Sequence, residues 1–210
     1  MVYNGRGRKS DNMEKNEVVI ATHNPGKVAE FKRMLEPLGF TVRSIADLGM
    51  KIEAEETGTT FEENSLIKAH DVGDRLKDRI VIADDSGLEI HALGGFPGIH
   101  SARFMEGSPY TEKMKALQEM LKGKADRSAN YTAAISLVNF DGEDHVFVGK
   151  TEGIILDSIL GGHGFGYDPF FYSTELKKTF GQATAEEKDS VSHRSKALKA
   201  CEDYIKAHLA

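Results

Sequence analysis

Two spacings of apolar residues alternate along this chain. Residues 18–21 and 80–83 are short β-branched and apolar runs, which are typical of buried strands. After the first run, apolar residues recur at helical spacing up to Gly39, a residue suited to end a helix. Further on, Thr59-Thr60 followed by Glu62-Glu63 gives two overlapping capping boxes, so a second helix is expected to begin there. Strands that alternate with helices favour an α/β fold.

The second half of the chain predicts antiparallel strands. Residues 131–139 and 145–150 have the composition of strands, and Asp141-Gly142 between them is a hairpin signal. Residues 88–92 alternate as in a further, half-exposed strand, separated from the run at 80–83 by the turn-like Asp84-Asp85-Ser86-Gly87. Apolar spacing predicts helices around residues 114–121 and from about His193 to the end. A hairpin beside strand–helix units implies a mixed sheet.

Composition narrows the class of protein without naming an activity. The formal net charge of −6 over 210 residues offers little to nucleic acid, which proteins usually meet with a basic face. We find no apolar run near the roughly 20 residues needed to cross a bilayer. The one cysteine, Cys201, lies in a helical apolar pattern and is interpreted as a core residue, which fits a reducing compartment such as the cytoplasm. Residues 1–15 are polar and are interpreted as a flexible tail.

The loop of residues 22–27 joins the first strand to the first helix. Asn24 suits the helix N-cap and Pro25 the first helical position. A helix N-terminus presents unpaired N–H groups and the positive end of the helix dipole, and Lys27 adds a full charge. The loop is therefore a candidate phosphate site, and a well-capped helix with a solvated lysine is the alternative.

Acidic residues supply a candidate metal site. Asp84 and Asp85 follow a buried strand, where ligands of open α/β sheets tend to bind. Neighbouring strand residues point to opposite faces, so only one of the two is expected to face a given site. Glu56 belongs to a second acidic cluster. Mg²⁺ prefers oxygen and takes one or two protein carboxylates, although an ordinary turn and an exposed charge run explain these segments too.

Two further segments could hold a base. Glycines at 161–166 let the backbone approach a ligand closely, and Phe165 among them could stack on a nucleobase. Lys188, His193 and Arg194 flank the start of the last helix, where positive charge opposes the helix dipole unless something neutralises it. A flexible turn and a solvated basic cluster are the alternatives.

Taken in order, these segments resemble the inosine triphosphate pyrophosphatase family, also called the HAM1-like or noncanonical purine NTP pyrophosphatases. The resemblance runs from about residue 18 to the C-terminus. It is carried by Thr22-x-Asn24-x-x-Lys27, Glu55-Glu56-Thr57-Gly58, Glu63-Asn64 with Lys68-Ala69, Ala83-Asp84-Asp85-Ser86-Gly87-Leu88, Gly94-Gly95-x-Pro97-Gly98, Ser101-Ala102-Arg103, Gly164-Phe165-Gly166-Tyr167-Asp168-Pro169, and Lys188 with Ser192-His193-Arg194.

The resemblance implies a long bent mixed sheet with helices on both sides and two lobes around a central cleft. It places one catalytic domain at residues 16–210 and implies a homodimer. The implied activity is Mg²⁺-dependent hydrolysis of ITP, dITP and XTP to the monophosphate and pyrophosphate, which cleanses the nucleotide pool.

Site residues are likewise carried over from the resemblance. The implied triphosphate ligands are Thr22, His23, Asn24, Pro25, Gly26, Lys27 and Lys68. Asp85 is implied to bind Mg²⁺ and to act as the base or to orient water, with Glu56 as the second metal ligand and Ser86 touching substrate. The implied base pocket consists of Phe165, Gly166, Tyr167, Asp168, Lys188, His193 and Arg194.

Two other functions remain open at this level. A nucleotide phosphatase would release orthophosphate from the γ position, and a nucleotide-binding sensor would hold the ligand without cleaving it. Turnover in Mg²⁺ and the identity of the product separate these from a pyrophosphatase.

Overall fold

The computed structural model describes residues 16–209. Its strands are β1 (Glu17–Ala21), β2 (Thr41–Ser44), β3 (Ile80–Ile90), β4 (Ser128–Val138), β5 (His145–Ile155), β6 (Phe171–Ser173) and β7 (Lys178–Thr179). Its α-helices are α1 (Pro25–Leu35), α2 (Phe61–Gly73), α3 (Tyr110–Met120), α4 (Ala185–Val191) and α5 (His193–His208). The fold is α/β, as predicted.

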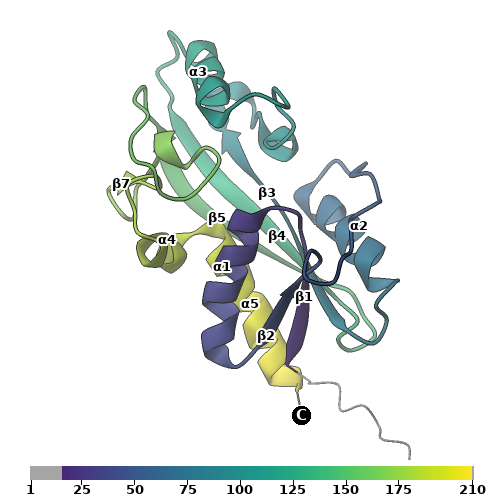
Figure 1. Ribbon diagram of the computed structural model, residues 1–210. Helices are drawn as coiled ribbons and strands as arrows, with labels where there is room; N and C mark the ends of the chain where they lie inside the picture. The colour runs from purple at the N-terminus through teal and green to yellow at the C-terminus, as the bar shows by residue number, and fades with distance from the viewer. Residues whose placement is uncertain (1–15, 210) are drawn as a thin grey trace, which may run out of the picture.

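One mixed sheet runs through the molecule, with the strand order β2-β1-β3-β4-β5-β6-β7 (Figure 1). Strand β1 is parallel to β2 and to β3. From β3 onward every neighbouring pair is antiparallel. The predicted hairpin is confirmed as β4 and β5, and both strands are longer than the sequence pattern indicated.

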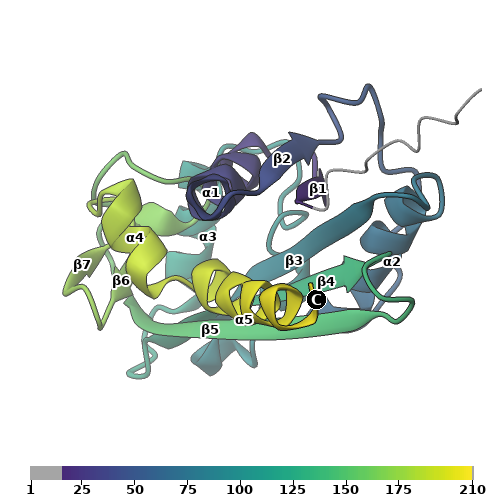
Figure 2. The same ribbon diagram turned by 90° about the horizontal axis from the view of Figure 1, so that it is seen from below.

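Helices cover both faces of the sheet (Figure 2). Val18, Ile20 and Ile82 point to one face and form a buried cluster with residues of α1 and α5. Val19 and Val81, one position away in their strands, point to the other face and pack with α2. This alternation is the ordinary consequence of strand geometry. A third cluster, around α3, occupies the far ends of β3 and β4.

Strand β3 corrects one prediction. Asp84-Asp85-Ser86-Gly87 was expected to end the strand in a turn, but β3 continues without a break to Ile90. The pairing with β4 is continuous from Val81↔Val138 to Ile90↔Ala129, so the ladder hydrogen bonds hold this segment extended. The pairing with β4 thus overrides the turn-forming composition of these four residues. The aspartates therefore lie in the middle of β3, at the level where the shorter β1 ends.

Helix boundaries follow the sequence signals closely. Asn24 caps α1 by accepting hydrogen bonds from the N–H groups of Gly26 and Lys27, and the helical run closes through a 3-10 turn at Gly39, whose φ is +90°. Thr60 caps α2 and Ser192 caps α5. Strands β2, β6 and β7 and helix α4 were not predicted, because all are short. Cys201 is fully buried in the core, as expected.

Two of the sequence predictions concern the chain as a whole. None of the helices within residues 16–209 has the length and apolar character that crossing a membrane requires. The tail predicted at residues 1–15 lies outside the described residues, and the division of residues 16–210 into two lobes stays a prediction.

Candidate active site

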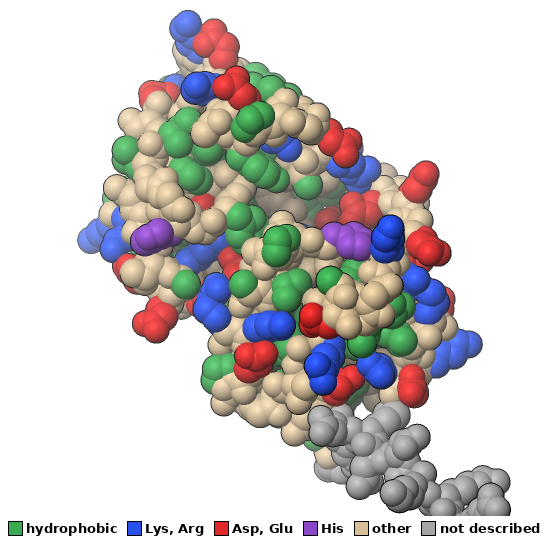
Figure 3. All heavy atoms as spheres, in the orientation of Figure 1, with side chains coloured by type: hydrophobic (Ala, Val, Ile, Leu, Met, Phe, Trp, Pro, Cys, Tyr) green, Lys and Arg blue, Asp and Glu red, His purple; other side chains and the backbone are tan. Residues whose placement is uncertain are grey.

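A cavity of about 340 Å³ opens beside the middle of β3. The space-filling view shows a hollow across this face, with acidic and histidine side chains gathered at one side of it (Figure 3). Every residue predicted to bind substrate lines the cavity except Pro25 and Gly26. Of the two predicted metal ligands, Glu56 lines it and Asp85 does not. Segments that lie far apart in the sequence are thus brought together in one place.

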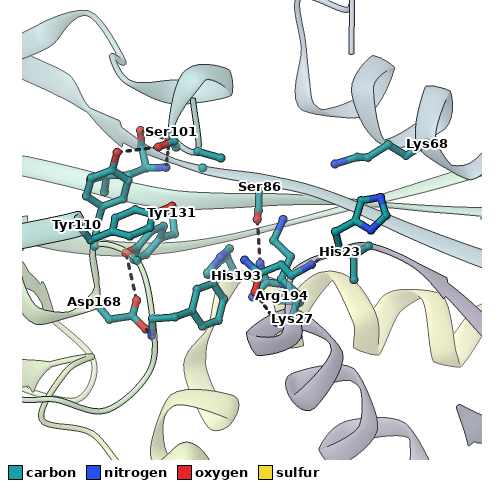
Figure 4. A pocket seen from close by; sticks show the side chains of 18 of the residues that line it. His23, Lys27, Lys68, Ser86, Ser101, Tyr110, Tyr131, Asp168, His193 and Arg194 are labelled. Carbon is teal, nitrogen blue, oxygen red and sulfur yellow. Dashed lines mark hydrogen bonds between the residues drawn. The ribbon is translucent and has the colours of Figure 1, made fainter. Parts of the chain in front are cut away.

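The cavity has two chemically different ends (Figure 4). Tyr110 and Tyr131 lie at one end, and His23 and Lys68 lie at the other. Lys27 and Arg194 stand between them. A ligand that fits this arrangement has an apolar, planar part and an anionic part.

The phosphate-loop candidate, residues 22–27, is built as the sequence suggested. The Asn24 side chain satisfies two N–H groups of the first turn of α1, and the Asn24 N–H donates to Thr22 Oγ1 at 3.1 Å. His23 is exposed, and its Nε2 accepts a hydrogen bond of 3.1 Å from the Ile52 N–H. This bond ties the loop to the acidic segment that carries Glu56.

Asp84 and Asp85 face opposite sides of the sheet, as strand alternation predicted. Asp84 is fully buried on the α1 and α5 side, 2.5 Å from Lys27 Nζ and 3.2 Å from Arg194 Nε. Burial alone would raise its pKa, but Arg194 and Lys27 together hold it well below the usual value. Asp85 faces α2 and its partner Lys68. Asp84 is therefore a charged structural partner of the cations, and Asp85 is the aspartate that keeps a buried oxygen without a partner.

Asp85, Lys68 and Glu56 form a chain of alternating charges. Lys68 Nζ lies 3.3 Å from Asp85 Oδ1 and 2.7 Å from Glu56 Oε1. Burial raises the pKa of Asp85 in spite of Lys68, with Glu56 and Asp84 adding to the effect. Burial also favours a raised pKa for Glu56, but Lys68 lowers it below the ordinary value. Arg103 Nη2 contacts the second Glu56 oxygen at 3.2 Å.

These residues fit a divalent cation held partly by substrate. The second oxygen of Asp85, Oδ2, is buried and has no hydrogen-bond partner, which is costly unless a ligand completes it. Within residues 16–209 no three His, Cys, Asp or Glu side chains gather into a metal-binding group. Mg²⁺ typically takes only one or two protein carboxylates and fills its remaining positions with water and phosphate oxygens.

The aromatic end is rigidly organised by Asp168. Its Oδ2 accepts from Lys188 Nζ at 2.7 Å and from the Phe165 N–H at 3.1 Å, while its Oδ1 accepts from the Tyr131 hydroxyl at 3.1 Å. Tyr131 in turn stacks on the His193 ring with centroids 4.7 Å apart. Because both oxygens of Asp168 are satisfied within the protein, its role is to hold Lys188, Phe165 and Tyr131 in place around the cavity.

His193 is the one predicted base-pocket residue that carries a buried polar atom without a partner, its Nδ1. Burial, followed by the nearby charges of Arg194 and Lys188, lowers the pKa of His193 well below its usual value. The ring is therefore neutral at pH 7 and offers one N–H donor and one acceptor nitrogen.

The basic cluster at the start of α5 is buried and paired, not solvated. Lys188 Nζ donates to Glu30 Oε1 at 2.7 Å, and Arg194 forms an ion pair with the other Glu30 oxygen. Burial alone would raise the pKa of Glu30, but Arg194 and Lys188 lower it to about 2. The pKa of Arg194 is raised by Asp84 and Glu30 against the effect of burial. Protein carboxylates thus supply the neutralisation that the sequence analysis sought in a ligand.

Sequence reasoning missed several residues of this site. Glu30 looks like an exposed position of an amphipathic helix, and Tyr131 like a core residue of a strand. Only the tertiary contacts with Lys188 and Asp168 reveal their place. Tyr110, at the first position of α3, carried no signal either. The further lining residues are Ile52, Ala54, Gly87, Leu88, Ser101 and Ala102.

Comparison with known proteins places this arrangement in a family. The sequence profile of the Ham1 family matches residues 18–204, nearly all of the described chain. The chain belongs to the Ham1 family. The match confirms the family resemblance found in the sequence.

Named relatives and solved structures agree with this assignment. The chain is 45% identical over 195 residues to the dITP/XTP pyrophosphatase of Bacillus subtilis, which covers 91% of this chain and 98% of the relative. It is 46% identical over 187 residues to the dITP/XTP pyrophosphatase of Thermus thermophilus, covering 88% and 89%. The Ham1 protein of Staphylococcus aureus superimposes with a TM-score of 0.81 at 40% identity, covering 91% of this chain and 98% of that structure.

Proposed function

We propose that this protein hydrolyses noncanonical purine nucleoside triphosphates, namely ITP, dITP and XTP, to the monophosphate and pyrophosphate. The observation that carries the proposal is one cavity whose Lys68 end contacts Asp85 and whose other end is lined by Tyr110, Tyr131 and Phe165. A nucleoside triphosphate has the matching polarity along its length. Relatives named dITP/XTP pyrophosphatase support the same substrate class.

The triphosphate lies at the end formed by the phosphate loop and Lys68. The first turn of α1 presents the positive end of the helix dipole, while its Gly26 and Lys27 N–H groups donate to Asn24 Oδ1. Lys68 is held charged, because Asp85 and Glu56 raise its pKa against the effect of burial. We place the α-phosphate near Asp85, because Asp85 contacts Lys68 and the next residue of β3, Ser86, lines the cavity.

Hydrolysis at the α-phosphate needs a positioned water and neutralised charge more than it needs a covalent intermediate. We assign the orientation of this water to Asp85, whose Oδ2 has no partner within the protein. Water adds to the α-phosphorus, and the bond from that phosphorus to the bridging oxygen breaks, so that pyrophosphate leaves. Ser86, which accepts from Arg194 Nη2 at 2.8 Å, is placed to contact the substrate on the opposite face of β3.

Asp85 and Glu56 are the residues that would hold Mg²⁺. When bound there, Mg²⁺ supplies charge neutralisation at the phosphates and increases the acidity of coordinated water. Removal of divalent metal with EDTA is expected to abolish turnover, and titration with MgCl₂ should restore it.

Base selection rests on donors at the aromatic end. Glu30 and Asp168 take two of the three N–H groups of Lys188, which leaves one for the carbonyl oxygen at C6 of hypoxanthine or xanthine. Adenine carries an amino donor at C6, and a donor facing a donor costs roughly 1–3 kcal/mol. Guanine shares the C6 oxygen and is excluded at C2, where its amino group meets a second donor or is crowded. Phe165 stacks on any purine and adds affinity without selectivity.

The decisive experiment is Mg²⁺-dependent turnover of ITP, XTP, dITP, GTP and ATP, with the phosphorus product identified. We expect pyrophosphate as the product, and kcat/KM for ITP and XTP well above that for GTP and ATP. Release of orthophosphate would instead indicate a γ-phosphatase, and tight binding without turnover a sensor. Equal efficiency for ATP and ITP would refute the proposed base selection.

The assembly and location follow from the family likeness alone. We propose a homodimer acting in the cytoplasm on small-molecule nucleotides, with no role for nucleic acid or membrane. Light scattering coupled to size-exclusion chromatography would test the dimer. One chain has a mass of 23.1 kDa, so a single species of that mass would refute the dimer.

A further inference from the structure

Gly26 is the second residue of α1 and has an ordinary helical backbone, so no positive φ requires a glycine there. Its N–H donates to Asn24 Oδ1 at 2.9 Å, a hydrogen bond that alanine would keep. Glycine is a poor helix former compared with alanine, so the local structure gives no reason for this residue. The reason must lie in what approaches Gly26 from outside the helix.

The Phe165 ring lies directly against Gly26. A Cβ atom built on Gly26 would be 2.6 Å from Phe165 Cδ1 and 2.9 Å from Cε1, far inside van der Waals contact. The missing side chain therefore leaves the space that the ring occupies. Gly26 and Phe165 also share the wall of a second cavity of about 440 Å³ behind the ring, whereas Gly26 does not line the main cavity.

Two cations and one backbone hydrogen bond set the position of Phe165 in the base pocket. Lys188 Nζ lies 4.5 Å from the ring centroid, and the Arg194 guanidinium lies 5.8 Å from it. The backbone is held by the hydrogen bond from the Phe165 N–H to Asp168. A methyl group on α1 would have to move the ring relative to the same cations that face the base.

We propose that Gly26 is a positioning residue for nucleobase recognition: it acts through Phe165 and has no direct contact with phosphate. This inference rests on the proposed function, because it assumes that Phe165 stacks on the purine. It changes the role that the sequence resemblance gave Gly26, which was to hold the triphosphate. It also links the start of α1 to the base pocket through a single side-chain contact.

The test compares Gly26→Ala with the parent enzyme on ligands that carry only one part of the substrate. KM for ITP is expected to rise about tenfold, the size of a lost base–aromatic stacking contact. The inhibition constant of inorganic tripolyphosphate, which has no base, should stay within about twofold, because Lys27, Lys68 and the helix dipole are unchanged. Gly162→Ala is the matched control, since a Cβ there meets nothing within 4 Å.

A double variant separates a clash with Phe165 from any other effect. In a Phe165→Ala background, Gly26→Ala should add no more than about twofold to KM, because residues in direct contact act non-additively. For the same reason, any drop in melting temperature that Gly26→Ala causes in the parent should be absent when the double variant is compared with Phe165→Ala. Equal losses in both backgrounds, or a tripolyphosphate constant that weakens as much as KM for ITP, would overturn the inference.

Direct binding distinguishes this inference from the proposed function. Inosine monophosphate carries the base but cannot release pyrophosphate. Its binding affinity, measured by calorimetry, therefore reports on the Phe165 contact without catalysis. We expect Gly26→Ala to weaken its binding about tenfold. A parent protein that binds inosine monophosphate in this Gly26-dependent way but does not hydrolyse ITP would refute the function alone. Unchanged binding in the variant would refute the inference alone.

Discussion

Replacement of Glu30 by glutamine tests whether the buried charge network stabilises the fold. Glu30 is 3% exposed, and its two oxygens contact Lys188 and Arg194. Glutamine keeps the size of the side chain and removes its charge, so the change isolates electrostatics from packing. Lys188 and Arg194 would keep Asp168 and Asp84 as their remaining carboxylate partners.

The size of the effect follows from the pKa of Glu30, which falls from 4.5 to about 2 in the folded protein. One pKa unit corresponds to about 1.4 kcal/mol, so the charged Glu30 contributes about 3 kcal/mol to the free energy of unfolding at pH 7. Breaking a buried ion pair typically costs about 3–5 kcal/mol. The two surviving carboxylates place the expected loss for Glu30→Gln at the lower end of that range.

The same shift fixes the pH dependence. A lowered pKa in the folded state means that the stabilisation is complete above the unfolded value and is lost as the pH falls through the folded value. At pH 3 only about 1.4 kcal/mol of the contribution of Glu30 remains. The difference in unfolding free energy between parent and Glu30→Gln should therefore shrink by about half from pH 7 to pH 3.

Urea unfolding followed by circular dichroism at a series of pH values measures both quantities. Glu36→Gln, an exposed position just beyond α1, is the control and should change stability by less than about 0.5 kcal/mol. A loss below about 1 kcal/mol for Glu30→Gln at pH 7, or a loss that stays constant down to pH 3, would show that the network does not act as argued.

Three further outcomes are expected. Asp85→Asn should lower kcat by several orders of magnitude with an unchanged circular dichroism spectrum, and near-normal turnover in Mg²⁺ would exclude Asp85 from the chemistry. Burial raises the pKa of Cys201 to about 12, so its thiol should react with a disulfide reagent at pH 8 only after denaturation, and rapid reaction of the native protein would contradict this. Deletion of residues 1–15 should leave kcat/KM and melting temperature almost unchanged, because that segment has no apolar pattern with which to pack, and a substantial fall in either would assign it a role.

Local signals of the sequence predicted four of the five α-helices in residues 16–209, because caps act within a few residues. Asn24 and Thr60 each make the cap hydrogen bond that their residue type suggested. The same local reasoning failed at residues 84–87, where Asp, Ser and Gly favour a turn. There the outcome depends on β4, a strand about 50 residues further on, and its pairing is invisible to a short window.

The candidate site shows the same difference between residues with a local signal and residues placed only by tertiary contacts. The residues of the loop at 22–27 and Phe165 could be singled out because glycine, proline and aromatic residues in loops suggest ligands. Glu30 could not, because a glutamate on a surface-type helix is ordinary until Lys188 is known to lie 2.7 Å away. Charge neutralisation is a three-dimensional property, and α1 and α4 come together only in the folded chain.

Strand β3 explains why two adjacent aspartates have different roles. β1 stops at Ala21, opposite Ala83, so at residues 84 and 85 that edge of β3 has no strand partner, and Lys27 of α1 reaches Asp84 there. Asp84 turns toward Lys27 and Arg194 and is fully paired. Asp85 turns toward α2, keeps one unpaired oxygen, and has a raised pKa. A single residue step along one strand thus separates the fully paired carboxylate from the carboxylate that keeps an unpaired oxygen and that we propose for catalysis.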